Sequence, residues 1–138
     1  MTSFKRILVG VDGSENAMRA VEFAAALAKR FEGKISLVHV VPPSDYALTS
    51  GKATYMEKDA KVGGERLRAA EELLTKEKVT FHSSVEFGNP AEQLLLLAKD
   101  HDLMVVGTRG LSPFKEALLG STSHRLVQMG RVPVTIVP

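Results

Sequence analysis

Short apolar runs recur along the chain, separated by segments with a helical spacing of apolar positions. Four runs, at residues 7–11, 35–41, 103–106 and 132–137, are largely apolar at successive positions rather than at alternate ones. Such runs are typical of strands covered on both faces, as in a parallel sheet. A fifth segment, residues 79–87, alternates apolar and polar positions, which predicts a strand near the edge of that sheet.

Helical patterns fill the intervals between these strands. The expected helices span residues 14–33, 55–76, 90–99 and 121–130. Ser14 and Asn89 are suitable N-caps, and Gly33 is a suitable C-terminal stop. The pair Gly63-Gly64 weakens the first half of the second helix, because glycine is a poor helix former.

Strands and helices thus alternate along residues 1–138, which predicts one α/β domain with an open, five-stranded parallel sheet and helices on both faces. Right-handed crossovers leave few arrangements, and we expect the strand order 3-2-1-4-5 of a Rossmann-like or flavodoxin-like fold. In such sheets ligands bind at the carboxyl ends of the strands, where the strand order reverses direction.

That rule brings two distant segments to one crevice, between the first and fourth strands. The first strand ends in Val11-Asp12-Gly13-Ser14, and the fourth ends in Gly107. Asp12 could accept hydrogen bonds from ribose hydroxyls or an adenine amino group, or it could serve only as a capping residue beside Ser14.

The second segment carries groups suited to an anion. Gly107 and Gly110 allow close backbone approach, and Gly120 precedes a helix that opens with Ser121 and Thr122. Free N–H groups at a helix start attract phosphates, and both hydroxyls could add hydrogen bonds. Arg109 and Lys115 could supply positive charge from the intervening loop.

The local pattern by itself leaves a plain glycine-rich connection open as the alternative. It is not a P-loop, because Ser121 stands where that motif requires lysine after its last glycine. It is not GxGxxG either, since two residues separate Gly107 from Gly110 and nine separate Gly110 from Gly120.

With this spacing, G-2X-G-9X-G-[S/T], the chain resembles the ATP-binding branch of the universal stress protein family. The resemblance extends over essentially all 138 residues and includes ILVGVDGSENA, VHVV, DLMVVGTRG, LLGSTSHRLV and VPVTIVP. It implies that adenine lies near Val11 and Val40 and that Asp12 contacts the ribose or the base. It implies a ribose and phosphate cradle of Gly107, Arg109, Gly110, Gly120, Ser121 and Thr122. Family members also dimerise through the last strand, here residues 132–137, where Pro133 and Pro138 are tolerated at an edge.

Composition narrows the function classes. The 138 residues include no cysteine, carry a formal net charge of +2 and show no basic stripe, so we expect a cytoplasmic protein that binds neither nucleic acid nor membrane. The apolar run behind Lys5-Arg6 stops at Asp12, too early for a signal peptide.

The histidines offer little chemistry. His39 is expected to be a buried or half-buried ring with its hydrogen bonds satisfied, and Asp100-His101-Asp102 to be a polar turn before the fourth strand. Ser123-His124 makes a poor catalytic pair, because adjacent helical residues point about 100° apart. No set of metal-binding residues is visible.

These residues favour a regulatory ATP-binding module, with Mg²⁺ or Mn²⁺ able to bridge the phosphates, over an enzyme. The alternatives are a slow ATP hydrolase or an enzyme that phosphorylates itself on Ser121 or another hydroxyl, since phosphoryl transfer depends mainly on positioning and charge. AMP or cyclic AMP could also be the natural ligand, because the glycines and Asp12 do not fix the number of phosphates.

Overall fold

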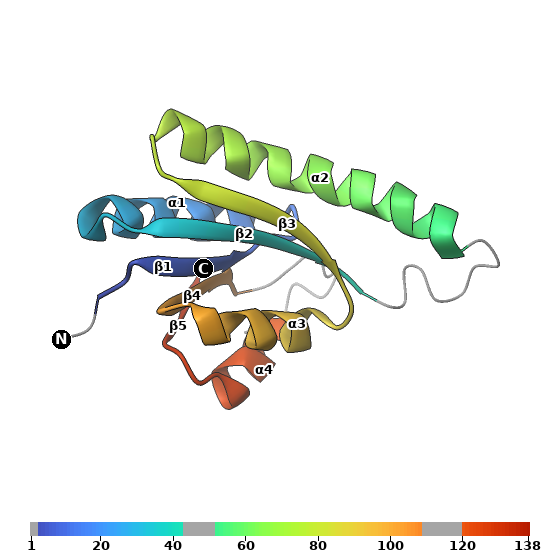
Figure 1. Cartoon of the computed structure of the whole chain (residues 1–138). Coiled ribbons are helices and arrows are strands. Elements are labelled where there is room, and N and C mark those ends of the chain that lie inside the picture. The colour runs from blue at the N-terminus through green and yellow to red at the C-terminus, as the bar shows by residue number, and fades with distance from the viewer. Residues whose placement is uncertain (1–2, 43–51, 109–119) are drawn as a thin grey trace.

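A parallel sheet of five strands forms the centre of the molecule, as predicted. The computed structural model describes residues 3–42, 52–108 and 120–138 (Figure 1). In chain order the elements are β1 (Arg6–Gly10), α1 (Glu15–Phe31), β2 (Lys34–Val41), α2 (Lys52–Lys76), β3 (Phe81–Phe87), α3 (Pro90–Leu97), the short 3₁₀ helix η2 (Ala98–Asp100), β4 (Leu103–Gly107), α4 (Ser121–Met129) and β5 (Val134–Val137). The strand order is β3-β2-β1-β4-β5, with every neighbouring pair parallel.

Helices cover both faces of this sheet: α1 and α2 lie on one face, and α3 and α4 lie on the other (Figure 1). In the central strand β1, Ile7 and Val9 pack beneath α1 and α2, while Leu8 packs on the α3 and α4 side. All three side chains are completely buried. The residues of this run are apolar at successive positions because helices cover both faces of the strand, as predicted.

Helix α1 begins and ends on local signals. The Ser14 hydroxyl accepts a hydrogen bond from the Ala17 amide at 3.1 Å, which confirms the predicted cap. At the other end Glu32 takes a left-handed conformation, and the Gly33 amide donates to the Ala28 carbonyl at 2.8 Å. A side chain at Gly33 would place its Cβ 2.6 Å from the Phe4 carbonyl oxygen, so glycine is also required by packing.

Two strands begin later than their patterns predicted. The amide of Val79 still bonds the end of α2, through the Leu74 carbonyl at 3.0 Å, so β3 starts at Phe81. Near the C-terminus β5 starts at Val134 rather than residue 132, because Pro133 has no N–H to donate to a ladder. The edge position of β3 is confirmed, and two apolar residues of its alternating pattern, Phe81 and Val85, pack on the α1 and α2 core.

Helix α2 begins at Lys52, three residues before the expected start, and continues through Gly63-Gly64 without a break. The two glycines differ in their surroundings. A Cβ at Gly63 would lie 2.9 Å from Cδ2 of His39 and 3.1 Å from a methyl group of Val85, whereas a Cβ at Gly64 would meet no atom within 4 Å. Gly63 thus allows α2 to approach the sheet, and Gly64 faces open space.

Alanine substitution should separate these two roles. Gly64→Ala should raise the free energy of unfolding by about 0.5–1 kcal/mol, because alanine is the better helix former and nothing obstructs it. Gly63→Ala should lower it by about 1–3 kcal/mol, because its methyl group overlaps the His39 ring. Urea unfolding followed by circular dichroism measures both, and equal effects of the two variants would contradict this assignment.

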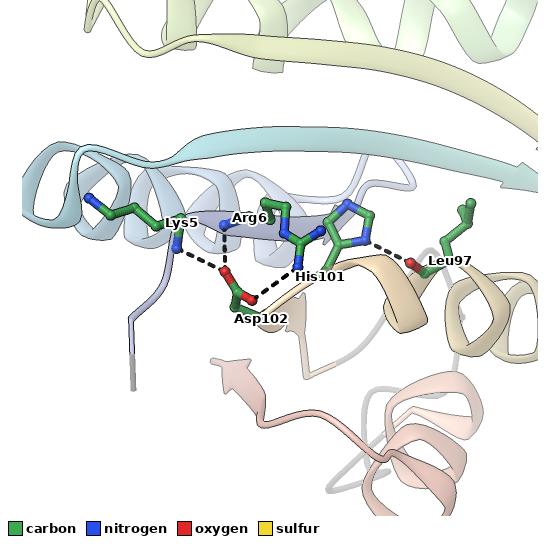
Figure 2. A network of polar contacts seen from close by, with 5 residues as sticks. All are labelled: Lys5, Arg6, Leu97, His101 and Asp102. Atoms are coloured by element: carbon green, nitrogen blue, oxygen red, sulfur yellow. Dashed lines mark hydrogen bonds and ion pairs between the residues drawn. The ribbon is translucent and has the colours of Figure 1, made fainter. Parts of the chain in front are cut away.

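A polar network joins the starts of β1 and β4 (Figure 2). Oδ2 of Asp102 accepts hydrogen bonds from the backbone amides of Lys5 at 3.1 Å and Arg6 at 3.0 Å, and its Oδ1 lies 3.6 Å from the Arg6 guanidinium. The Asp102 amide in turn donates to the Arg6 carbonyl at 2.7 Å. The segment expected to be only a polar turn therefore holds the first residues of the central strand.

His101 adds a second connection in the same turn. Its Nδ1 donates to the Leu97 carbonyl at 2.7 Å, and its Nε2 lies 2.8 Å from the Ser36 hydroxyl on β2 (Figure 2 shows the Leu97 contact). The ring links the end of α3 to the sheet, which its sequence neighbours did not indicate.

Asp102→Ala should lower the free energy of unfolding by about 1–3 kcal/mol, because two backbone amides lose their acceptor. Asp102→Asn should cost less than about 1 kcal/mol, since its amide oxygen can still accept both bonds and only the partly exposed pairing with Arg6 is lost. Urea unfolding of both variants at neutral pH tests this, and a larger loss for Asn than for Ala would refute the hydrogen-bonding role.

Candidate functional site

The carboxyl ends of β1 and β4 lie next to each other, where the strand order changes direction. The two strands pair directly, with Val9 opposite Val105. After β1 ends, the chain remains bonded to β2, since the Val11 amide donates to the Val38 carbonyl on β2 at 2.8 Å. The residues expected to line the crevice from the first strand, Val11 and Asp12, thus follow β1 directly at the edge where Gly107 ends β4.

Asp12 takes part in the capping of α1. Its Oδ1 accepts a hydrogen bond from the Ser14 amide at 2.9 Å, and Gly13 between them has a positive φ of 88° that suits glycine. The side chain is half-buried, and no group among the described residues donates to its second oxygen, Oδ2. The capping function is therefore real, and it leaves one carboxylate oxygen available at the crevice.

Arg66 is a neighbour of this turn that the sequence did not reveal. It lies on the exposed side of α2, and a Cβ built on Gly13 would be 3.4 Å from its Cγ. Carbon atoms of its side chain therefore lie beside the turn that holds Asp12. Only the path of α2 across the sheet brings it there, so no local motif could have indicated it.

Gly107 has a packing function. A Cβ at this position would lie 2.8 Å from Cβ of Asn16 and 2.9 Å from its backbone carbon, so α1 begins in direct contact with the end of β4. The Asn16 amide group also donates to the Thr108 hydroxyl at 3.4 Å. The sequence pattern explained this glycine by a ligand, whereas the structure gives it a requirement that holds without one.

Two hydrogen bonds fix the start of α4 to the end of β4. The Gly120 amide donates to the Thr108 carbonyl at 2.6 Å, and the buried Ser123 hydroxyl donates to the Gly107 carbonyl at 2.6 Å. Ser123 is therefore bonded to the end of β4. Thr108 and Gly120, which eleven residues separate in the sequence, are thus joined directly.

The first turn of α4 presents backbone donors at that edge. Gly120 is the N-cap and supplies no side-chain acceptor, so the first amides of the helix, those of Ser121, Thr122 and Ser123, have no acceptor within the helix. Ser121 is exposed and Thr122 half-buried. This arrangement suits an anion, because free N–H groups and the helix dipole both favour negative charge.

The remaining predicted residues divide into two groups. Val40 and Val11 are buried, at 8% and 3% exposure, near the carboxyl edge of the sheet. Arg109, Gly110 and Lys115 lie outside the described residues. The described parts of the predicted site all lie toward the carboxyl edge of the sheet, with Val11 packed in the α1 and α2 core and Val40 in the α3 and α4 core: Val11, Asp12, Val40, Gly107, Gly120, Ser121 and Thr122.

His39 supports the candidate site through a hydrogen bond to its backbone. Its ring is 4% exposed, as predicted for a satisfied core histidine, and Nδ1 donates to the Val11 carbonyl at 2.8 Å. The bond holds the backbone just before Asp12. The ring in turn lies against Gly63, so the position of α2 and that of the Asp12 turn are set by one side chain.

Within residues 3–42, 52–108 and 120–138, no three histidine, aspartate or glutamate side chains gather as a metal site would require. Over the same residues, no helix is long and apolar enough to cross a membrane.

The fold and this edge define a class of protein. A parallel sheet of order 3-2-1-4-5 with two helix starts at its switch point is a Rossmann-like α/β protein, in which phosphate-bearing ligands commonly bind at that edge. The model of the universal stress protein family matches residues 3–138, and the chain belongs to this family.

Individual relatives agree with this assignment. The universal stress protein YxiE of Bacillus subtilis is 32% identical over 148 aligned positions, which cover 97% of this chain and 99% of YxiE. The solved structure of UspA from Lactobacillus plantarum is 23% identical, with a TM-score of 0.87 and complete coverage of both chains. A universal stress protein solved in complex with cAMP is 25% identical, with a TM-score of 0.66 and coverage of 99% and 98%.

The packing function of Gly107 makes a prediction that needs no ligand. Gly107→Ala should lower the free energy of unfolding by about 1–3 kcal/mol, because the new methyl group overlaps Asn16 and pushes the start of α1 from β4. Urea unfolding of the ligand-free protein measures the loss. An unchanged stability would show that Gly107 serves ligand approach alone.

Proposed function

We propose that this protein is an ATP-binding regulatory module of the stress response. The observation that carries the proposal is the start of α4, where unpaired backbone amides lie at the switch point of the sheet. The G-2X-G-9X-G-[S/T] spacing of Gly107, Gly110, Gly120 and Ser121 supports the choice of a nucleotide as the anion. Family membership agrees with it.

In this proposal each predicted residue has a distinct role. Oδ2 of Asp12 accepts a hydrogen bond from the ribose or the base, while Oδ1 keeps its bond to Ser14. The adenine ring lies near the apolar side chains of Val11 and Val40. The amides and hydroxyls of Ser121 and Thr122 bind phosphate oxygens.

The glycines and the basic loop residues complete the proposed cradle. Gly110 and Gly120 let the backbone approach the ribose and the phosphates. Gly107 lets the start of α1 pack directly against the end of β4. Arg109 and Lys115 contribute positive charge toward the phosphates. Mg²⁺ or Mn²⁺ would be held mainly by the phosphates, because the described donors here are hydroxyls and one shared carboxylate.

A cyclic or single phosphate is the second candidate ligand. The structure of a related universal stress protein in complex with cAMP favours it specifically. With fewer phosphates, the α4 start and Asp12 would keep the same roles. The positive charges of Arg109 and Lys115 would contribute less to binding. Catalysis is a third candidate, either as slow hydrolysis of ATP or as phosphorylation of the exposed Ser121 at the start of α4.

A homodimer through the last strand also belongs to this proposal. β5 is at the end of the strand order and bonds β4 alone among the described strands, so its other edge can accept a strand. Antiparallel pairing of residues 132–137 with a second copy would cover that edge.

Calorimetric titration of nucleotide-free protein with ATP, AMP and cyclic AMP, each with and without Mg²⁺, tests the binding function. We expect saturable binding that is tightest for ATP. Gly120→Val should weaken it by about tenfold or more, because a branched side chain would stand where the phosphates approach the α4 amides. Asp12→Asn should weaken it by about fivefold to tenfold, the equivalent of one hydrogen bond.

The control is Val127→Ser, an exposed position on α4 away from its start, which should bind ATP like the wild type. No saturable binding of any of the three nucleotides by folded wild-type protein would overturn the proposal. Tightest binding of cyclic AMP or AMP would replace ATP as the ligand. Sustained phosphate release, or transfer of labelled phosphate to the protein, would show that it is an enzyme.

A further inference from the structure

An apolar groove lies between α3 and α4. These two helices cover the face of the sheet opposite to α1 and α2 (Figure 1). Its volume is about 540 Å³. Apolar side chains form its floor: Leu95, Leu96, Met129 and Val132. The floor residues come from the second half of α3, from the end of α4 and from the segment that follows α4, so the groove lies away from the α4 start that carries the candidate nucleotide site.

Two of these apolar side chains are unusually exposed. Leu96 is 55% exposed and Met129 is 57% exposed. Of the described residues, the other large apolar side chains with comparable exposure are Val127 and Phe23, neither of which lines the groove. Exposed apolar residues that gather in one hollow, rather than occurring singly, are typical of a binding surface.

The charges around the groove have a clear polarity. Near the start of α3, Glu92 and Arg125 pair with each other at 3.4 Å. At the other end lie Lys99 and Arg131, both exposed, and neither forms an ion pair within the described residues. The carboxyl ends of the two helices contribute about half a negative charge each, and the carboxylate of Asp100 beside Lys99 is not part of the groove lining, so the lining itself keeps an excess of positive charge.

We propose that this α3–α4 groove binds an acidic amphipathic helix of a partner protein. Helices recognised in grooves bury an apolar stripe with anchors at positions i, i+3 or i+4, and i+7, and the floor supplies the apolar surface for it. Carboxylates beside the stripe would pair with Lys99 and Arg131. This proposal is independent of nucleotide binding.

The same charges disfavour the other occupants. A second copy would present the same groove, in which the one lining carboxylate, Glu92, is already paired with Arg125, so it offers no free acid to Lys99 and Arg131. A nucleic acid would satisfy the cations but would gain nothing from the exposed floor of Leu96 and Met129. An acidic helix matches both features of the surface.

The test uses the full chain and two synthetic peptides of 18 residues. One is an amphipathic helix of leucine, alanine and glutamate, and the other has lysine in place of every glutamate. Fluorescence anisotropy should show saturable binding of the acidic peptide, weakened by added salt, and at least about tenfold weaker binding of the lysine peptide.

Variants then locate the site. Leu96→Ser and Met129→Ser should each weaken binding of the acidic peptide by about fivefold or more, and both residues are exposed enough to be changed without loss of the core. Val127→Ser, equally exposed on the same helix but outside the groove, is the matched control and should bind like the wild type. Lys99→Glu with Arg131→Glu should reverse the preference, so that the lysine peptide binds better.

Several results would overturn the proposal. These are equal binding of the two peptides, no binding of either, or an effect of Val127→Ser as large as that of Met129→Ser. Sedimentation that shows a dimer lost on Met129→Ser would assign the groove to a second copy. Capture by vesicles with anionic lipids, lost in the Lys99→Glu and Arg131→Glu protein, would assign it to a membrane surface.

Discussion

The central strand β1 determines where a ligand can bind. It pairs with β2 on one side and β4 on the other, both parallel to it. Along the sequence, the strand after β1 therefore lies on one side of it, and β4 lies on the other side. Two right-handed crossovers then leave the starts of helices on opposite faces at the same edge, above the gap between β1 and β4. The complete burial of Ile7, Leu8 and Val9 holds that strand in place.

Around this gap most polar contacts connect parts of the fold to one another, and they form without a nucleotide. Ser123 holds Gly107, the Gly120 amide holds Thr108, and His39 holds the Val11 carbonyl. The edge is therefore organised before a ligand arrives. A site whose backbone donors are already fixed loses less entropy on binding than one that must be ordered by its ligand.

The sequence predicted the strand order, the caps and the meeting of distant segments, because each depends on a local signal or on a general rule. Ser14 and Asn89 cap helices as their types favour, and the apolar runs report burial on both faces. Asp102 and Arg66 could not be predicted in the same way. Their neighbours in space, Lys5 and Gly13, lie 97 and 53 positions away in the chain, and only the packed structure brings them together.

The glycines also show what the sequence could not predict. A glycine pattern indicates that a side chain is excluded, but it does not identify what excludes it. At Gly107 the excluding group is Asn16 of α1, and at Gly63 it is the His39 ring. Both glycines bring helices close to the sheet near its carboxyl edge. Part of the motif that suggests a nucleotide therefore also maintains the shape in which a nucleotide could bind.

Helix α4 is the element common to the two proposed surfaces. Its first turn lies at the switch point, and Met129 at its last turn lies in the groove with α3. A helix of this length spans only about 14 Å, and Leu126 buried at its middle fixes it to the sheet. A displacement of this helix would therefore couple the two ligands directly. By thermodynamic linkage, a nucleotide that changes the affinity of the groove by some factor must have its own affinity changed by the same factor.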